Sequence, residues 1–545
     1  MKKYGIYLAY SPTVDMRAEG LGRHLAEFLK GAQARGDICF VIACPSWLRA
    51  NLLELFEASG VHPDSFEMLS PESKPLLLRA HECYVRFRRR SVRDTQHPPL
   101  QSRLRTLRSK VIGYAERKLA TSRSLAGAGM AALAFFPLLA AGVLAFAFMR
   151  IFSLARIAGR KAKSLLARHP VIRKYRTGLD TCTSSRPKPE PFVIRLYRLM
   201  EEAEVSLMRE LIEKRKDIAA WYSPTAFWPH FNEIPAPRLI CVPDVVLTDF
   251  PAGFAPLGDD RMLDSFRKVE RTIENGQYFI SYSADVKWRT LVDRYHIDPA
   301  AITIVPHGAN RLDEVVAMSG FADNETATDA LCRSLLQAAL RKALNNGCAR
   351  LFSAGDMRFV FYASQFRPNK NVLSLLRAYA YLLRRRHIGH KLILTGNPKM
   401  MPEIGQFVTE HHLQNDVLFL NRLSAQELAA CYRMASLAVN PSLSEGGCPF
   451  TFTEALSVGT PVVMARIPVT EEVIINPELQ DAMLFDPYDW KDIADKIEWG
   501  LQNRQLLLAR QKPFYEQLAQ RSWRNVVDEY VEILDRISAR HAEAQ

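Results

Sequence analysis

Residues 441–463 read PSLSEGGCPFTFTEALSVGTPVV, a glycine-rich loop followed by a helical stretch and a β-branched run. Backbone N–H groups of such a loop, together with the start of the helix, suit phosphate or sugar oxygens. The acids Glu445 and Glu454 suit hydroxyl groups, because an ionised carboxylate only accepts hydrogen bonds and can take two neighbouring hydroxyl donors. For Glu454 alone, an interaction with its own helix dipole is the structural alternative.

Short apolar runs alternate with helical stretches on both sides of this segment. The C-terminal half contains RFVFYAS near residue 360, KLILTG near 393, DVLFLN near 418, LAVNPS near 440 and TPVVMA near 463. The N-terminal half has such runs at residues 4–10 and 38–44 and near 240, 280 and 305. Continuous β-branched runs of this kind predict parallel sheets buried on both faces. Two series predict an α/β protein with two Rossmann-like domains.

The same pattern sets the expected domain boundaries. We expect an N-terminal domain over residues 1–310, with an insertion at about 85–185, and a helical connection over 311–350. A C-terminal domain over 351–515 and a last helix over 516–545 complete the chain.

The charge of the chain is unevenly distributed. The whole sequence has 72 Lys and Arg against 58 Asp and Glu, a net charge of +14. Between Arg79 and Gly178 there are 22 basic residues and three acids, so the rest of the chain has 50 basic and 55 acidic residues. With 48% hydrophobic and 24% charged residues, the composition excludes a disordered or fibrous protein. The sequence therefore predicts a mildly acidic globular body that carries one very basic segment.

An uncharged run of 26 residues, 124–149, lies inside the basic segment. It is long enough to span a bilayer, but Arg-rich flanks on both sides favour the cytoplasmic face for both ends. Pro137 near its middle is expected to kink the helix. We expect a re-entrant hairpin with basic helices lying on anionic lipid headgroups. The hairpin residues expected in the membrane are Phe135, Phe136, Pro137, Phe146 and Phe148.

Two other interpretations of this segment stay open. The apolar run could be a helix pair buried at a subunit interface. The basic residues could bind nucleic acid, although phosphate binding does not require an apolar run. We therefore expect no nucleic-acid partner.

The remaining features indicate a cytoplasmic protein. MKKYGIYLAYS has too short an apolar stretch for a signal peptide. The nine cysteines form no C-x-x-C pair and no metal-ligand spacing, which is typical of reduced thiols in a cytoplasmic compartment.

Residues 441–463 resemble the donor-binding region of the retaining glycosyltransferases of family 4, which have the GT-B fold of two Rossmann-like domains facing across a cleft. The family pattern is E-x7-E, commonly followed by A-x-x-x-G-x-P-V-V. Glu454 and Ala455, then residues 459–463, match this pattern. Glu445 departs from it, because eight residues rather than seven separate it from Glu454.

Other segments extend the resemblance in order along the chain. SQFRPNKNVLSLLRAY resembles the segment in which a basic pair clamps the donor diphosphate: Lys370 falls on the family's Lys, Gln365 stands where many members have Arg, and Arg367 is the candidate for the second charge. Gly396, and Arg422 with Leu423, fall in segments that resemble the wall receiving the nucleotide base.

The N-terminal half also carries part of the resemblance. Gly20 and Gly22, in EGLGR, resemble the family's glycine loop, although an ordinary tight turn is the alternative. Pro243 replaces a His that many members carry near the reacting sugar, which leaves Asp244 as the candidate polar group. His307 stands where relatives often have Asn.

The resemblance implies transfer of a hexose, of mannose or glucose type, from a nucleotide-diphosphate sugar to a lipid-linked or glycan acceptor, with retained configuration and neither cofactor nor metal. The basic segment with its uncharged run places this activity at the cytoplasmic face of a bacterial inner membrane. The implied catalytic residues are Glu445, Lys370, Arg367 and Asp244; Glu454 would hold the ribose, and Gly446 and Gly447 the donor sugar. The alternative function is a catalytically inactive GT-B scaffold in a polysaccharide assembly complex.

Overall fold

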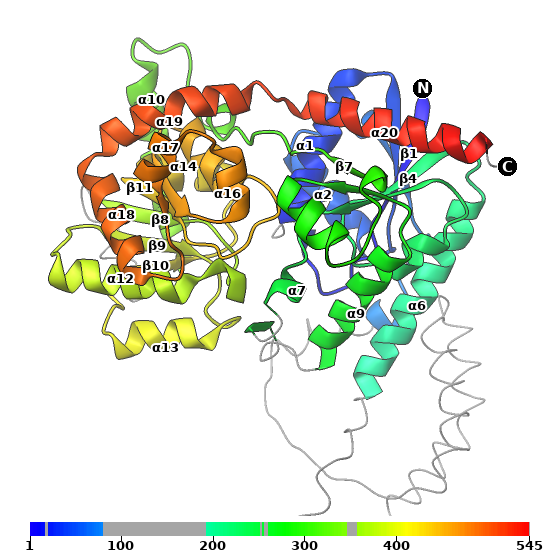
Figure 1. Cartoon of the computed structure of the whole chain (residues 1–545), viewed down its shortest axis with the longest axis horizontal. Helices are drawn as coiled ribbons and strands as arrows, with labels where there is room; N and C mark the ends of the chain where they lie inside the picture. The colour runs from blue at the N-terminus through cyan, green and yellow to red at the C-terminus, as the bar shows by residue number, and fades with distance from the viewer. Residues whose placement is uncertain (17–19, 80–191, 251–252, 255–259, 346–356, 544–545) are drawn as a thin grey trace, which may run out of the picture.

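The computed structural model describes residues 1–16, 20–79, 192–250, 253–254, 260–345 and 357–543 (Figure 1). The expected hairpin at 124–149, like most of the basic segment, lies outside the described residues. Among the helices that are described, none is both long enough and apolar enough to cross a membrane.

The N-terminal unit is built on a seven-stranded sheet whose neighbouring strands all run parallel. The strand order is β3-β2-β1-β4-β5-β6-β7, so the direction of winding reverses between β1 and β4. All six residues of β2 are buried, as its apolar sequence ICFVIA predicts for a strand covered on both faces. The strands are β1 (Lys2–Tyr7), β2 (Ile38–Ala43), β3 (Phe66–Leu69), β4 (Ile218–Ser223), β5 (Arg238–Val242), β6 (Tyr278–Ser281) and β7 (Ile302–Ile304).

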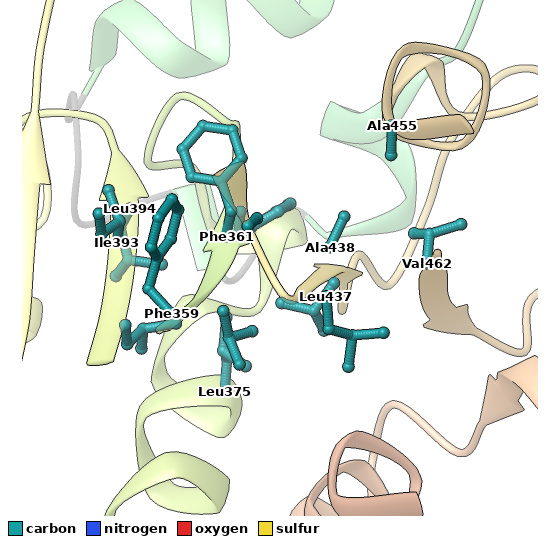
Figure 2. Packing of buried hydrophobic residues seen from close by; sticks show 14 of the residues in the cluster. Phe359, Phe361, Leu375, Ile393, Leu394, Leu437, Ala438, Ala455 and Val462 are labelled. Atoms are coloured by element: carbon teal, nitrogen blue, oxygen red, sulfur yellow. The ribbon is translucent and has the colours of Figure 1, made fainter. Parts of the chain in front are cut away.

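The C-terminal unit has a six-stranded parallel sheet in the order β10-β9-β8-β11-β12-β13. Its winding reverses between β8 and β11. Figure 2 shows Phe359 and Phe361 of β8 packed among side chains of the neighbouring strands and of α12. The strands are β8 (Phe359–Tyr362), β9 (Lys391–Thr395), β10 (Val417–Leu420), β11 (Leu437–Asn440), β12 (Val462–Ala465) and β13 (Leu484–Phe485).

Helices cover both faces of each sheet, as expected for doubly wound units. The N-terminal unit has α1 (Gly20–Arg35), α2 (Arg49–Ala58), α6 (Phe192–Glu213), α7 (Val246–Asp249) and α9 (Asp260–Glu274), with the short helices η2 (Pro63–Ser65), η4 (Pro229–Glu233), η5 (Val286–Val292) and η6 (Pro299–Ala301). In the chain, η7 (Asp313–Val315) and α10 (Asn324–Leu340) come after the last strand of the first sheet and before the first strand of the second. The C-terminal unit has η8 (Pro368–Lys370), α12 (Val372–Arg385), α13 (Pro402–Glu410), α14 (Ala425–Met434), α15 (Phe450–Ser457), α16 (Pro468–Val473), α17 (Pro477–Met483), α18 (Trp490–Gln502) and α19 (Arg504–Ala519).

The last helix, α20 (Trp523–Glu543), returns to the N-terminal unit. Figure 1 shows α19 over one unit and α20 over the other. The apolar face of α20 belongs to the N-terminal core, where it packs against α1 and β4. Gly31 permits this packing, because a Cβ atom there would lie 2.5 Å from the carbonyl oxygen of Trp523. The chain end thus ties the two units together.

The two units also meet directly through the loop that follows β11 and through α16. The hydroxyl of Ser283 donates a hydrogen bond of 2.9 Å to the carbonyl oxygen of Gly446. The Glu472 carboxylate of α16 accepts hydrogen bonds from the backbone N–H groups of Ala284 and Asp285, at 2.8 and 3.2 Å. A Cβ atom on Gly446 would stand only 1.5 Å from the carbonyl oxygen of Pro243, so only glycine allows this close approach.

Gly446→Ala should therefore weaken the contact between the units. We expect the added methyl group to destabilise the closed arrangement by about 1–3 kcal/mol, as overpacking does in cores, while each sheet stays folded. The radius of gyration from small-angle X-ray scattering should increase. Gly405→Ala, on α13, is the control, because the added Cβ atom would make only an ordinary van der Waals contact. An unchanged scattering profile for Gly446→Ala would contradict the prediction.

Candidate functional site

The candidate site lies where the carboxyl ends of the two sheets face each other. In open α/β sheets, ligands bind beyond the carboxyl ends of the strands at the point where the winding reverses. In the C-terminal sheet this point lies between β8 and β11. Lys370 follows β8 and Glu445 follows β11, so the topology brings these two distant segments together.

Lys370 and Glu445 form an ion pair in which Nζ donates to Oε1 at 2.6 Å. Their side chains are only 20% and 17% exposed. Burial by itself lowers the pKa of Lys370, but Glu445, Tyr362 and Asp244 outweigh it and hold the pKa above its ordinary value. Lys370 therefore keeps its positive charge at neutral pH.

The backbone around this pair is fixed by hydrogen bonds between the same two loops. The N–H of Leu443 donates to the carbonyl oxygen of Asn369 at 2.7 Å. In return, the side-chain amide of Asn369 donates to the carbonyl oxygen of Ser444 at 3.3 Å. Asn369 is 2% exposed, so this link is part of the core that supports the ion pair.

Asp244 approaches from the N-terminal unit, just beyond β5. Burial raises its pKa, Lys370 opposes this shift and Glu445 reinforces it. These mutual effects mean that Asp244, Lys370 and Glu445 share one electrostatic environment across the boundary between the units. The structure places these three residues close enough to act on one another electrostatically, and their catalytic roles stay predictions.

Glu454 is held in the same region by residues of the N-terminal half. Its side chain on α15 is only 3% exposed. Arg23 Nη1 donates to Glu454 Oε1 at 2.8 Å, and Asn310 Nδ2 donates to the same oxygen at 3.3 Å. The helix-dipole alternative is wrong, because α15 begins at Phe450 and Glu454 lies beyond its first turn. The carboxylate is paired instead with a guanidinium from the opposite unit.

Gly447 of the glycine-rich loop lies close to His307. A Cβ on Gly447 would lie 2.9 Å from Tyr282 and 3.4 Å from the His307 ring. The His307 ring contacts Phe450 with a centroid distance of 4.3 Å. Behind it, His24 Nε2 lies 3.2 Å from the Tyr282 hydroxyl, and burial, assisted by His307, lowers the pKa of His24 to about 3. Burial also lowers the pKa of His307, so both rings are neutral at neutral pH.

The other predicted residues lie in different surroundings. Gly22 is needed for packing, since a Cβ there would meet the carbonyl oxygen of Met16 at 2.0 Å, whereas Gly20 has open space around it. Gly396 adopts φ +132° against Phe366.

The remaining predicted cation positions are more exposed. Arg367 is exposed and donates to the side-chain oxygen of Gln365 at 2.8 Å. Arg422 is also exposed, with a left-handed φ of 55°, and Leu423 packs against the C-terminal core. The charge of Arg367 opposes the rise of the Asp244 pKa, so Arg367 lies near the site of the Lys370–Glu445 pair, whereas Arg422 was predicted for the wall of the nucleotide base.

Arg23 belongs to the segment EGLGR, whose resemblance implies an approach to the donor phosphates, but no partner was predicted for Arg23, and no role was predicted for Asn310 or Ser283. Arg23 directly follows the glycine loop, and Asn310 follows the strand end at His307, so both sit next to segments that had been singled out. Their pairing with Glu454 joins segments separated by 431 and 144 positions, which no local pattern reports.

The chemistry that this arrangement offers is anion binding beside hydroxyl binding. Lys370 and Arg23 supply positive charge, and Glu445, Glu454 and Asp244 supply acceptors for hydroxyl groups. Within the described ranges, no group of three or more His, Cys, Asp and Glu side chains could hold a metal ion.

Comparisons with known proteins match the C-terminal unit. Residues 349–517 fit the family model for glycosyl transferases group 1. The serotype-specific mannosyltransferase WbdA of Escherichia coli is 27% identical over 183 residues, which cover 33% of this chain and 22% of WbdA. The O-antigen chain mannosyltransferase RfbU of Salmonella typhimurium is 30% identical over 135 residues, 24% of this chain and 36% of RfbU. The chain thus spans well under half the length of these relatives.

A solved structure matches the whole architecture. The crystal structure of HepE from Anabaena in complex with UDP and glucose has a TM-score of 0.53 and 12% identity, and the match covers 98% of this chain and 100% of HepE. At this identity the likeness shows the shared fold alone. The resemblance inferred from the sequence is confirmed at this level: residues 349–517 match the glycosyl transferases group 1 family, and the two facing parallel sheets have the GT-B fold.

Proposed function

We propose that this protein is a retaining glycosyltransferase that moves a hexose from a nucleotide-diphosphate sugar to a membrane-associated, lipid-linked glycan. One observation supports the proposal: the Lys370–Glu445 pair lies beyond the carboxyl end of the C-terminal sheet with Asp244 in its electrostatic environment, and the same glycine-rich segment carries Glu454, whose buried carboxylate pairs with Arg23 of the N-terminal unit. A cation, hydroxyl acceptors and a glycine loop at this point suit a ligand with a diphosphate between two sugars.

Each group has a role that fits its surroundings. Lys370, whose pKa is raised, holds the diphosphate and stabilises the charge that develops as it leaves. Glu454 accepts the ribose hydroxyls, and Glu445 with Gly446 and Gly447 holds the donor sugar. Asp244 faces this group from the acceptor-binding unit, and Arg367 is a further candidate for the diphosphate.

Retention requires no protein nucleophile if the acceptor attacks from the side of the leaving group. The departing phosphate oxygen then takes the proton of the acceptor hydroxyl as the new glycosidic bond forms and the sugar–phosphate bond breaks. The neutral His24 and His307 are consistent with this route, because they lie at the site without adding charge.

The hexose is of mannose or glucose type in this proposal. WbdA and RfbU are named as mannosyltransferases, and the matched HepE crystal holds UDP and glucose. A thermal-shift screen of GDP-mannose, UDP-glucose, UDP-galactose and UDP-N-acetylglucosamine distinguishes these donors, because only a true donor raises the melting temperature at low concentration.

Glu454→Gln should weaken binding of the donor selected by this screen. Loss of the charged acceptor for the ribose hydroxyls is expected to raise the Kd about 10- to 100-fold, as for a hydrogen bond to a charged group. Transfer of the sugar to membrane extracts should fall at least as much. The measurements are isothermal titration calorimetry and a radiolabelled transfer assay.

The matched control is Glu478→Gln, which removes an exposed carboxylate from α17. Unchanged donor binding and transfer in Glu454→Gln would contradict the assigned role. If no nucleotide sugar binds the wild-type chain, the inactive scaffold replaces the enzyme.

The basic insertion is proposed to dock the N-terminal unit on the cytoplasmic surface of a bacterial inner membrane. Its two attachment points support this geometry. The chain leaves after β3, and α6 leads into the parallel strand β4, so α6 must begin at the carboxyl edge of the sheet. Both attachment points therefore lie at the same sheet edge as Asp244, where a lipid-linked acceptor would enter.

Deleting residues 85–180 should release the protein from vesicles that contain phosphatidylglycerol. In the full chain, replacing Phe135, Phe136, Phe146 and Phe148 with serine should also reduce binding, because each buried phenylalanine contributes about 1.5–3 kcal/mol. Flotation with the vesicles measures both effects. A deletion variant that still floats would rule out this docking mode, and a serine variant that changes only its oligomeric state would favour a subunit interface.

A further inference from the structure

Arg23 occupies an unusual place for a surface arginine. It lies in the first turn of α1, directly after Gly22, and its Nη1 reaches the buried Glu454 carboxylate of the opposite unit at 2.8 Å. Its side chain is nevertheless 44% exposed. No other hydrogen bond of this guanidinium is seen among the described residues. Part of its fork of five N–H donors is therefore accessible beside Glu454.

The positive charge at the site is scarce for the ligand that we propose. A nucleotide-diphosphate sugar carries two negative charges on its diphosphate, whereas Lys370 is one cation and is already paired with Glu445. Arg367 is exposed, donates to Gln365 and acts on Asp244 through its charge, but no contact joins it to Glu454 among the described residues. Arg23 is the described cation that already touches the carboxylate assigned to the ribose.

The covalent structure of a nucleotide also places the diphosphate near Arg23. One methylene and one ester oxygen separate the ribose ring from the first phosphate. A donor whose ribose hydroxyls lie at Glu454 must therefore place its diphosphate close to any group that contacts the same carboxylate. The planar arginine fork can hold a carboxylate with one nitrogen and a phosphate with the others.

We propose that Arg23 is the second cation of the diphosphate site and that it reaches the diphosphate from the N-terminal unit. This inference rests on the proposed function. Because Lys370 belongs to one unit and Arg23 to the other, the diphosphate is held between them, and donor binding stabilises the closed arrangement of the units.

Arg23→Met tests the proposal by separating the phosphate from the ribose. We expect the affinity for UDP or GDP, whichever binds the wild type, to fall about 10- to 100-fold, whereas the affinity for uridine or guanosine changes less than about twofold. Arg23→Lys should recover part of the diphosphate affinity, because it keeps the charge and loses the fork. Calorimetry gives both constants, and the melting temperature verifies folding.

The control is Arg377→Met, which removes an exposed arginine of α12 and should leave both affinities unchanged. Equal losses for the diphosphate and the nucleoside would overturn the proposal, because Arg23 would then only position Glu454. A gain in diphosphate affinity would also overturn it and make Arg23 a competitor of the ribose. A loss in Arg367→Met with none in Arg23→Met would assign the second charge to Arg367.

These outcomes are distinct from a failure of the proposed function. If the wild-type chain binds neither UDP nor GDP, the donor site itself is refuted and the inference falls with it. If the wild type binds one of them and Glu454→Gln weakens that binding, the donor site stands and the Arg23 variants decide the inference alone.

Discussion

Two carboxylates are buried where the units meet, and a buried charge is stable only beside a counter-charge. Glu445 finds it in Lys370, from the neighbouring strand end of the same sheet. Glu454 finds it in Arg23, from the other unit. The second pair cannot form unless the units lie face to face, so the electrostatics of the C-terminal unit depend on the N-terminal unit.

The rest of the architecture serves this facing arrangement. Parallel strands direct all their carboxyl ends to one edge, and each sheet reverses its winding near the site. Gly446 allows backbone to meet backbone between the units, and Gly31 allows α20 to settle on α1. Glu472 adds a contact that uses only backbone donors of the N-terminal unit. These contacts limit how far the two units can move apart without local unfolding or a hinge motion.

The sequence predicted most of the sheets and only part of the site. β2 and the strands β5 to β12 fall on apolar runs that a period analysis detects, but β3 has one buried residue in four and β13 has only two residues, so neither gives such a signal. β4 was missed although it is apolar and as long as β2, because its sequence IAAWYS has only one β-branched residue. Lys370, Glu445 and Glu454 were predicted from resemblance, whereas the Arg23–Glu454 pair depends on tertiary structure that links positions 431 apart. Arg367 was predicted as the second charge on the diphosphate; its side chain donates to Gln365 and its charge acts on Asp244, and the role stays a prediction.

Asp244 completes the electrostatic argument. It is the third carboxylate at the site, and burial raises its pKa above its ordinary value. A diphosphate that binds Lys370 and Arg23 adds negative charge nearby and must raise the pKa of Asp244 further. Donor binding would thereby favour proton uptake by Asp244, which removes a repulsion from the closed site and leaves a hydroxyl donor facing the sugar. A carboxyl group in this state can orient the acceptor by hydrogen bonding while the departing phosphate oxygen takes the proton of the attacking hydroxyl.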